Sequence, residues 1–245
     1  MVYHERFREV YSSDPAAQPG RIESIYDVLH GHFDFVKPDP ASAEDLKLVH
    51  GESHINHVKS LGLAYEIAKL AVGGAIKAAE LALGGESAFG LIRPPGHHAS
   101  RDSSWGFCYF NNIAIAIEKL RRRGAIRKAL IVDFDLHFGD GTAGIFSSTP
   151  EVSYFHLGVG LETLSSFLAA MRDYEIIALS AGFDRHEEDW GGMLKTEDYQ
   201  AIGSMIKEHA GKNCGGRCFA VLEGGYNTRV LGRNVKALLD GLEQA

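Results

Sequence analysis

The sequence predicts an α/β fold in which a mostly parallel sheet lies between two layers of helices. Short segments that are apolar along their whole length are typical of strands buried on both faces of a parallel sheet. We expect such strands at residues 88–92, 129–134, 152–155, 176–180 and 218–222. Segments with helical periodicity separate or follow them, and polar residues gather at the ends of four of them. This alternation is typical of a three-layer α/β/α sandwich, whose ligands bind beyond the carboxyl ends of the strands.

The first part of the chain is expected to be helical after an initial loop. Residues 1–20 are polar and contain prolines, so a loop is expected there. Residues 21–30 have apolar side chains at helical spacing and predict the first helix. Ser42 suits the N-cap of a second, short helix because acidic residues follow it in the first turn. A longer helix is expected over 67–81, where small residues predict close packing on the sheet, and the glycine pair 84–85 ends it.

The later part of the chain alternates helices with the remaining strands. Helices are expected at 111–122, 141–148, 161–172, 196–212 and 228–243. The sequence contains no internal repeat, low-complexity tract or clear linker. With 45% hydrophobic and 23% charged residues, its 245 residues suit one domain with a sizeable core. We therefore expect a single catalytic-type domain over residues 1–245.

Charge and cysteine content narrow the partners and the compartment. The formal net charge of −7 predicts no basic face for nucleic acid or for an anionic membrane. The arginine run 121–123 is expected to be the solvated end of a helix. An odd number of cysteines, three in all, argues against a disulfide framework, and Cys214 and Cys218 are expected to be structural. No segment resembles a signal peptide or a membrane span, so a cytoplasmic protein is expected.

Three polar residues alternate at the end of the apolar segment that begins at residue 129. In an extended backbone, Asp133, Asp135 and His137 would share one side of the strand. Carboxylates and an imidazole at the end of a buried strand are costly to bury unless something binds them. A divalent metal is one candidate, because these ligand types suit zinc, iron or manganese. A buried hydrogen-bond network without a metal is the other interpretation.

Further polar clusters follow the other strands and suggest hydrolytic chemistry. His97 and His98 follow a Pro-Pro-Gly turn, and Asp184 follows another apolar strand. A pair of glycines near the end of the chain allows a sharp turn that presents Tyr226. Two histidines oriented by carboxylates can act as base and acid, and a tyrosine hydroxyl can stabilise an oxyanion. Together with a metal that keeps open positions, these residues suit a metal-dependent hydrolase.

Five motifs in this order resemble those of the histone deacetylase and acetylpolyamine amidohydrolase family. They are RPPGHHA at 93–99, GFCYFNNIAIA at 106–116, DFDLHFGDGT at 133–142, SAGFD at 180–184 and LEGGYN at 222–227. The resemblance extends from residue 21 to the C-terminus and is to a shortened, prokaryotic-type member. It implies an arginase-like and deacetylase-like three-layer fold, which agrees with the alternation of helices and strands.

The resemblance also implies a role for each residue that matches a motif position. It implies a catalytic metal, expected to be zinc with iron(II) as the alternative, held by Asp135, His137 and Asp184. His98 would act as the general base and then the acid, with Asp140 behind it. His97, paired with Asp133, would act mainly through its charge, and Tyr226 would hydrogen-bond the scissile carbonyl. The implied reaction is metal-dependent hydrolysis of the amide of an acetylated amine, an acetylpolyamine or an acetyl-lysine.

The substrate tunnel of the family is only partly matched. Gly106 and Phe107 resemble one wall of the tunnel, and Gly225 is expected to contact substrate from the turn before the tyrosine. The connection 158–176 is much shorter than in the family, so the second wall has no counterpart. We therefore expect a shallow, open site that hydrolyses small N-acetyl amides with modest selectivity. Another chain, as in a homo-oligomer, could complete the wall.

A second, structural cation is also implied by the resemblance. In many members Asp133 helps to hold a monovalent ion, K⁺ or Na⁺, with backbone ligands around Asp135 and His137. The serine often found near this ion has no clear counterpart here, so the remaining ligands are not assigned.

Two other functions fit parts of the pattern. A ureohydrolase of the same fold would need a two-metal manganese site with additional Asp and His ligands, whereas SAGFDRH offers a single Asp. A non-catalytic or weakly active scaffold that binds acetylated ligands would fit the missing part of the tunnel. The presence of every catalytic position favours the deacetylase over the scaffold.

Overall fold

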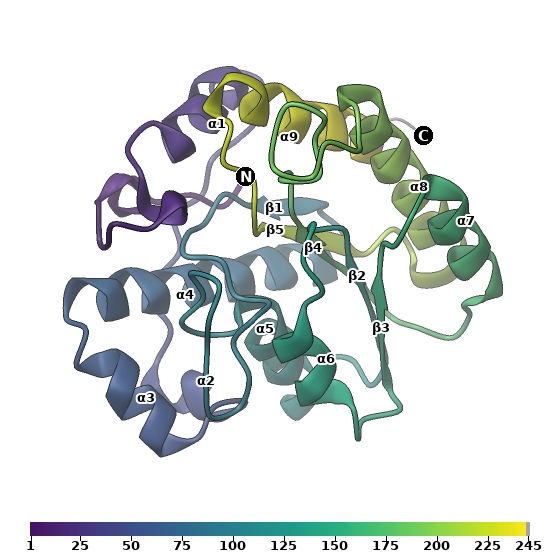
Figure 1. The fold of residues 1–245 in the computed structure, drawn as a ribbon. Helices are drawn as coiled ribbons and strands as arrows, with labels where there is room; N and C mark the ends of the chain where they lie inside the picture. Colours follow the sequence, from purple (N-terminus) through teal and green to yellow (C-terminus); the bar gives the residue numbers. More distant parts are fainter. Residues whose placement is uncertain (244–245) are drawn as a thin grey trace.

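A parallel sheet forms the centre of the computed structural model, which describes residues 1–243. The described residues form the strands β1 (Ala88–Gly90), β2 (Ala129–Asp133), β3 (Val152–His156), β4 (Ile177–Ala181) and β5 (Cys218–Leu222). They lie in the order β1-β5-β4-β2-β3 with every neighbouring pair parallel (Figure 1). The predicted α/β class is therefore confirmed, with small differences at the strand ends. Of the domain expected over 1–245, residues 244–245 lie outside the described part.

Two layers of helices cover the sheet (Figure 1). One layer contains α1 (Arg21–Leu29), α7 (Leu161–Ala170), α8 (Thr196–Cys214) and α9 (Thr228–Glu243). The other contains α2 (Ala43–Lys47), α3 (Glu52–Lys59), α4 (Leu63–Leu83), α5 (Asn112–Arg122) and α6 (Asp140–Phe146). The three layers are those that the sequence predicts, and no helix in the described part is long and apolar enough to cross a membrane.

The core forms because the inner strands are apolar on both faces. Leu130, Ile131 and Val132 of β2 are fully buried between the two helical layers. Burying each such side chain contributes about 1.5–3 kcal/mol. The small residues of α4 allow close packing, as expected, but only partly on the sheet. A Cβ at Gly74 would overlap the side chain of Ile92 after β1, whereas one at Gly73 would overlap the backbone of the loop around residue 39.

Residues 1–20 contain no α-helix and only two short 3₁₀ helices, in keeping with the predicted loop, but this loop is packed into the fold. Val2 bridges Gly90 at the end of β1, with hydrogen bonds Val2 N to Phe89 O (2.8 Å) and Leu91 N to Val2 O (2.9 Å). Phe7, in the short 3₁₀ helix Glu5–Arg8, is fully buried. Isolated apolar residues without a helical or alternating period gave no sequence signal for this packing.

The parallel topology brings the functional loops to one edge of the sheet. The segments after β1, β2, β4 and β5 all leave from carboxyl ends, so they meet there. A hydrogen bond of 2.8 Å from the Gly224 backbone to Asp135 joins the loop after β5 to the loop after β2. Another, of 3.0 Å, runs from the Leu136 backbone to Asp184 after β4. Residues far apart in the sequence are therefore assembled into one site.

Candidate metal and catalytic site

Asp135, His137 and Asp184 lie together, and we refer to them as the Asp-His-Asp cluster. One ligand atom from each lies within 4.8 Å of the others. Nδ1 of His137 is 3.3 Å from Asp135 Oδ1 and 3.2 Å from Asp184 Oδ2. The two aspartates are buried and the histidine is partly exposed. The cluster is therefore open on the histidine side only.

The backbone that presents this cluster is a turn, not the extended strand that the sequence predicts. Strand β2 ends at Asp133, and the next residues curl around their own carboxylates. Oδ1 of Asp135 accepts the backbone N–H of His137 at 2.9 Å. Asp133 in turn accepts the backbone N–H of Asp135 at 3.0 Å. The prediction that the three side chains share one side of a strand is therefore wrong, although Asp135 and His137 do converge.

A glycine in the loop after β5 leaves the room that the cluster needs. A Cβ at Gly224 would lie 2.5 Å from Asp135 Oδ2 and 2.7 Å from Asp184 Oδ2. The absence of a side chain lets the backbone N–H of Gly224 approach and donate to Asp135. The two carboxylates are thus held close together with little other space between them.

The charges of the cluster are unbalanced in a way that suits a divalent cation. Burial, followed by the charge of Asp135, raises the pKa of Asp184 to about 6. Burial would also raise the pKa of Asp135, but the charge of His97 and hydrogen bonds from His137 bring it below its usual value. Oδ2 of Asp184 is buried and has no hydrogen bond to any described residue. Two carboxylates, one imidazole and an unsatisfied oxygen fit zinc or iron(II).

His97 and Asp133 form a buried pair beside the cluster. Nδ1 of His97 lies 3.0 Å from Asp133 Oδ2, which also accepts the hydroxyl of Tyr154 at 2.9 Å. Burial alone would lower the pKa of His97, but the charges of Asp135 and Asp133 raise it well above its usual value. The two carboxylates therefore favour the cationic form of His97. Sequence reasoning missed Tyr154, which lies on β3 and gave no signal of its position next to Asp133.

His98 and Asp140 form a second pair, which Trp105 covers. Nδ1 of His98 lies 2.7 Å from Asp140 Oδ1, and the Trp105 indole N–H donates to Asp140 Oδ2 at 2.9 Å. The Trp105 ring also stacks on the His98 ring, with centroids 3.8 Å apart. Burial and the charge of His97 lower the pKa of His98. His98 is thus a neutral imidazole with Nδ1 engaged, which leaves Nε2 available to accept a proton.

Tyr226 lies in a small aromatic pocket above the cluster. The pocket has a volume of about 110 Å³. Its lining consists of Pro95, His97, His98, Trp105, Gly106, Phe107, His137, Trp190, Gly224 and Tyr226. The Tyr226 ring stacks on Trp190 with centroids 4.0 Å apart. Burial and the charge of Asp135 raise the pKa of Tyr226 well above its usual value, so its hydroxyl stays a donor.

Trp190 lines the pocket beside Phe107, the residue expected to form one wall of the tunnel. Its ring lies near Phe107, with centroids 6.4 Å apart, and both rings contact Tyr226, so the three aromatic side chains form one group in the pocket. Among the described residues that line the pocket, none belongs to the short connection 158–176, from which no second wall was expected. The neighbouring Asp189 points away from the pocket mouth: its Oδ2 accepts the backbone N–H groups of Tyr226 and Asn227, each at 2.8 Å.

Two further expected or missed residues shape the loops around the pocket. Gly225 has a φ of 117° and offers its carbonyl to the buried Arg21 at 2.7 Å, and it is Gly224 that lines the pocket. Glu223 was not predicted as functional, although it belongs to a motif. Its buried carboxylate accepts the backbone N–H groups of Gly96 (2.6 Å) and His97 (3.2 Å), and burial raises its pKa to about 7. It therefore fixes the loop that carries both histidines.

Comparison with known proteins identifies the family. The sequence model of the histone deacetylase domain matches residues 62–157 and 162–242. The chain belongs to the histone deacetylase family. A probable deacetylase of Methanothermobacter thermautotrophicus is 33% identical over 266 residues, which cover 85% of this chain and 79% of that protein. A histone deacetylase-like amidohydrolase of Pseudomonas aeruginosa is 29% identical, over 84% of this chain and 70% of its own.

The fold comparison agrees with this assignment. The crystal structure of an HDA15 HD domain superposes with a TM-score of 0.87 at 24% identity, over 98% of this chain and 88% of that one. This likeness establishes the fold. Membership of the histone deacetylase family places the chain among deacetylase and amidohydrolase enzymes and sets aside the ureohydrolase alternative.

The residues expected to hold a monovalent cation in this histone deacetylase domain are engaged otherwise. The Asp133 carboxylate accepts hydrogen bonds from Asp135 N and Tyr154 and pairs with His97. The Asp133 carbonyl accepts the backbone N–H of Leu157 at 2.8 Å. The Asp135 carbonyl accepts a hydrogen bond from Arg185. A positively charged guanidinium therefore stands at the Asp135 carbonyl, where a K⁺ or Na⁺ ion was expected.

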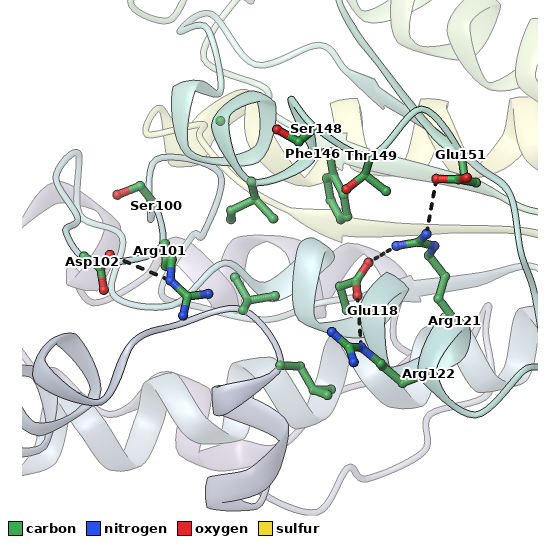
Figure 2. A pocket seen from close by; sticks show the side chains of 14 residues that line it. Ser100, Arg101, Asp102, Glu118, Arg121, Arg122, Phe146, Ser148, Thr149 and Glu151 are labelled. Atoms are coloured by element: carbon green, nitrogen blue, oxygen red, sulfur yellow. Dashed lines mark hydrogen bonds and ion pairs between the residues drawn. The ribbon is translucent and has the colours of Figure 1, made fainter.

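A hollow larger than this pocket lies elsewhere in the described part of the chain. Figure 2 shows its polar lining, which includes Arg101, Arg121 and Arg122. Arg121 pairs with Glu118 and Glu151, Arg122 with Glu118, and Arg101 lies 3.9 Å from Asp102. Each arginine is balanced by a carboxylate, so the hollow offers no net charge for a ligand. The predicted solvated arginines at the end of α5 are thus ion-paired at its rim.

Proposed function

We propose that this chain is a metal-dependent deacetylase that hydrolyses the amide of N-acetylated amines. The observation that carries the proposal is the Asp-His-Asp cluster, which lies beside two histidine–carboxylate pairs and a tyrosine in one pocket. A polyamine deacetylase of Mus musculus is a relative, 29% identical over 73% of this chain and 33% of its own length. An acetylated amine, acetylpolyamine or acetyl-lysine is the substrate class that we infer.

The Asp-His-Asp cluster would hold the metal, zinc or iron(II). When bound, the metal supplies Lewis-acid chemistry, which polarises an amide carbonyl and lowers the pKa of water. The protein's part is to fix the donor atoms. Backbone N–H groups of Leu136, His137 and Gly224 orient the carboxylates, as the supporting shell of a metal site must.

The remaining pocket residues would move the proton and stabilise charge. His98 is neutral, so its Nε2 can take a proton from water, and Asp140 at Nδ1 stabilises the imidazolium that forms. The same Nε2 then returns the proton to the leaving amine. Cationic His97 adds positive charge nearby, and the Tyr226 hydroxyl donates to the oxyanion of the substrate.

The pocket dimensions favour a short acyl group on a slender stem. A pocket of about 110 Å³ is small compared with the roughly 300–1,000 Å³ of sites that enclose drug-sized ligands. The aromatic rings of Phe107 and Trp190, which lie edge to face, would cover part of a methylene stem as it enters the pocket. We propose that residues 1–245 act as one catalytic domain in the cytoplasm, where three free cysteines would stay reduced.

A substrate panel tests this function. Protein reconstituted with zinc or iron(II) is assayed for acetate release from acetyl-lysine peptides, free acetyl-lysine and acetylated polyamines, at several protein concentrations. We expect turnover of at least one class that a chelator abolishes and the metal restores. Binding of acetylated amines without acetate release under every metal condition would instead support a non-catalytic scaffold. A specific activity (rate per chain) that rises with protein concentration would indicate a homo-oligomer that completes the pocket.

A further inference from the structure

Arg185 directly follows a residue of the Asp-His-Asp cluster and is buried, with 4% of its surface exposed. Its Nε donates to the carbonyl of Asp135 at 2.9 Å. Its Nη1 donates to the carbonyl of Gly158 at 2.9 Å, and its Nη2 to the carbonyl of Leu157. These carbonyls belong to the loops after β2 and β3, and Arg185 itself follows β4. One guanidinium therefore joins the carboxyl ends of these three strands.

The surroundings of this guanidinium are those of a cation site. Burial lowers the pKa of the Arg185 guanidinium, and the charges of Asp135, Asp184 and Asp133 act against this and favour its charged form. Nε2 of His156 lies 3.2 Å from Arg185 Nη2 and 3.0 Å from the Asp135 carbonyl. That imidazole can accept from the arginine in one tautomer or donate to the carbonyl in the other. Converging carbonyl oxygens beside buried carboxylates are the ligands that hard monovalent and divalent cations take in proteins.

We infer that Arg185 is a built-in cation that positions the Asp-His-Asp cluster and replaces a bound monovalent ion. The guanidinium donates to the Asp135 carbonyl, which belongs to the backbone that the ion is expected to use, so the two cations compete for this place. Its planar set of N–H donors satisfies carbonyls on two loops at once. Through the Asp135 carbonyl it holds the backbone of a cluster residue, so Arg185 acts as a positioning residue.

The thermal stability of metal-free protein tests the inference without turnover. Unfolding is followed in KCl, NaCl and choline chloride at equal ionic strength. For the unmodified chain we expect the same Tm in all three salts, because no monovalent site remains to be filled. Arg185→Met keeps the aliphatic stem but removes the donors, and we expect its Tm in choline chloride to fall by roughly 10 °C. KCl should restore part of that loss, since the exposed carbonyls and carboxylates can then bind the ion.

A matched control separates this effect from the loss of any buried arginine. Arg21 is equally buried and donates to the carbonyls of Glu223 and Gly225. Arg21→Met should lower Tm without a specific gain from K⁺. If Arg185→Met does not fold, Arg185→Lys is used in its place, because one ammonium satisfies fewer carbonyls and should show a smaller loss of the same kind.

A second measurement tests positioning. The zinc affinity of Arg185→Met, measured by competition with a chromophoric chelator, should fall by at least about tenfold. A Tm of the unmodified chain that rises specifically with K⁺, or an Arg185 variant with unchanged Tm and zinc affinity, overturns the inference. It concerns the site of the proposed function, but neither measurement needs activity. An inactive protein whose Tm ignores K⁺ would therefore contradict the proposed function and leave this inference standing.

Discussion

Gly224→Ala should disrupt metal binding while changing only one methyl group. Gly224 does not have the left-handed backbone that would exclude alanine. The substitution also keeps the backbone N–H that donates to Asp135. The new Cβ would lie 2.5 Å from Asp135 Oδ2 and 2.7 Å from Asp184 Oδ2, whereas contacts under 3.0 Å are essentially absent from real structures. At least one carboxylate must therefore move.

The size of that movement sets the expected effect. Asp135 Oδ2 must withdraw by the difference between 3.0 Å and 2.5 Å, which is half an ångström. Metal–ligand distances tolerate deviations of only about 0.2 Å. Changes that disturb the support of a ligand typically reduce metal affinity by about 10- to 100-fold. Because two ligands are affected at once, we expect a loss of zinc affinity of about a hundredfold.

The assay is a zinc competition titration on the folded variant, with folding checked by circular dichroism. The matched control is Gly211→Ala in α8, where a Cβ meets nothing within 4 Å. That change should leave zinc affinity unchanged and stabilise the helix by about 0.5–1 kcal/mol. A Gly224→Ala protein that binds zinc as tightly as the control would refute the argument that these carboxylates form the metal site.

Other consequences of the site geometry can be measured separately. Tyr226→Phe should lower kcat by about 10²–10³ with metal content unchanged, and near-normal turnover would remove this hydroxyl from the mechanism. Trp105→Phe keeps an aromatic ring beside the general base but loses the N–H bond to Asp140, so kcat should fall roughly tenfold with little change in KM. A rise in KM alone would make Trp105 a substrate contact instead. Burial raises the pKa of all the cysteine thiols, that of Cys214 to about 11, so at about pH 8 they stay protonated. A disulfide reagent should therefore titrate them slowly in native protein and fast after denaturation, and rapid reaction of any one in the native state would contradict their burial.

The sequence predicted most of the sheet and the grouping of polar loops at one edge. Strands β2 and β5 are apolar on both faces and bounded by polar turns, so their pattern could be read without neighbours. The proximity of Asp135 and His137 was predicted for the wrong reason. The strand ends earlier, and hydrogen bonds to the Asp135 carboxylate bend the chain instead. Local pattern thus located the residues but not the backbone that presents them.

Residues that act across loops could not be predicted in this way. Trp105 lies 35 positions from Asp140, and Arg185 lies 50 positions from Asp135, with only the fold to bring each pair together. The sequence placed Trp190 close to the mouth of the substrate pocket. Its contact with Phe107, however, depends on how the loop after β4 folds back. A single sequence contains no pairing information of this range. The N-terminal packing of Val2 was missed for the same reason.

We propose that amide hydrolysis requires a metal held by Asp135, His137 and Asp184. This requirement is tested most directly by titrating metal-free protein with zinc or iron(II) and measuring, in the same samples, bound metal and acetate release from an acetylated amine. We expect the rate to rise in proportion to bound metal and to stop rising when the cluster is filled, and we expect Asp184→Asn to bind no metal and release no acetate. Acetate release by metal-free protein, or full metal binding by the Asp184 variant with normal turnover, would contradict it.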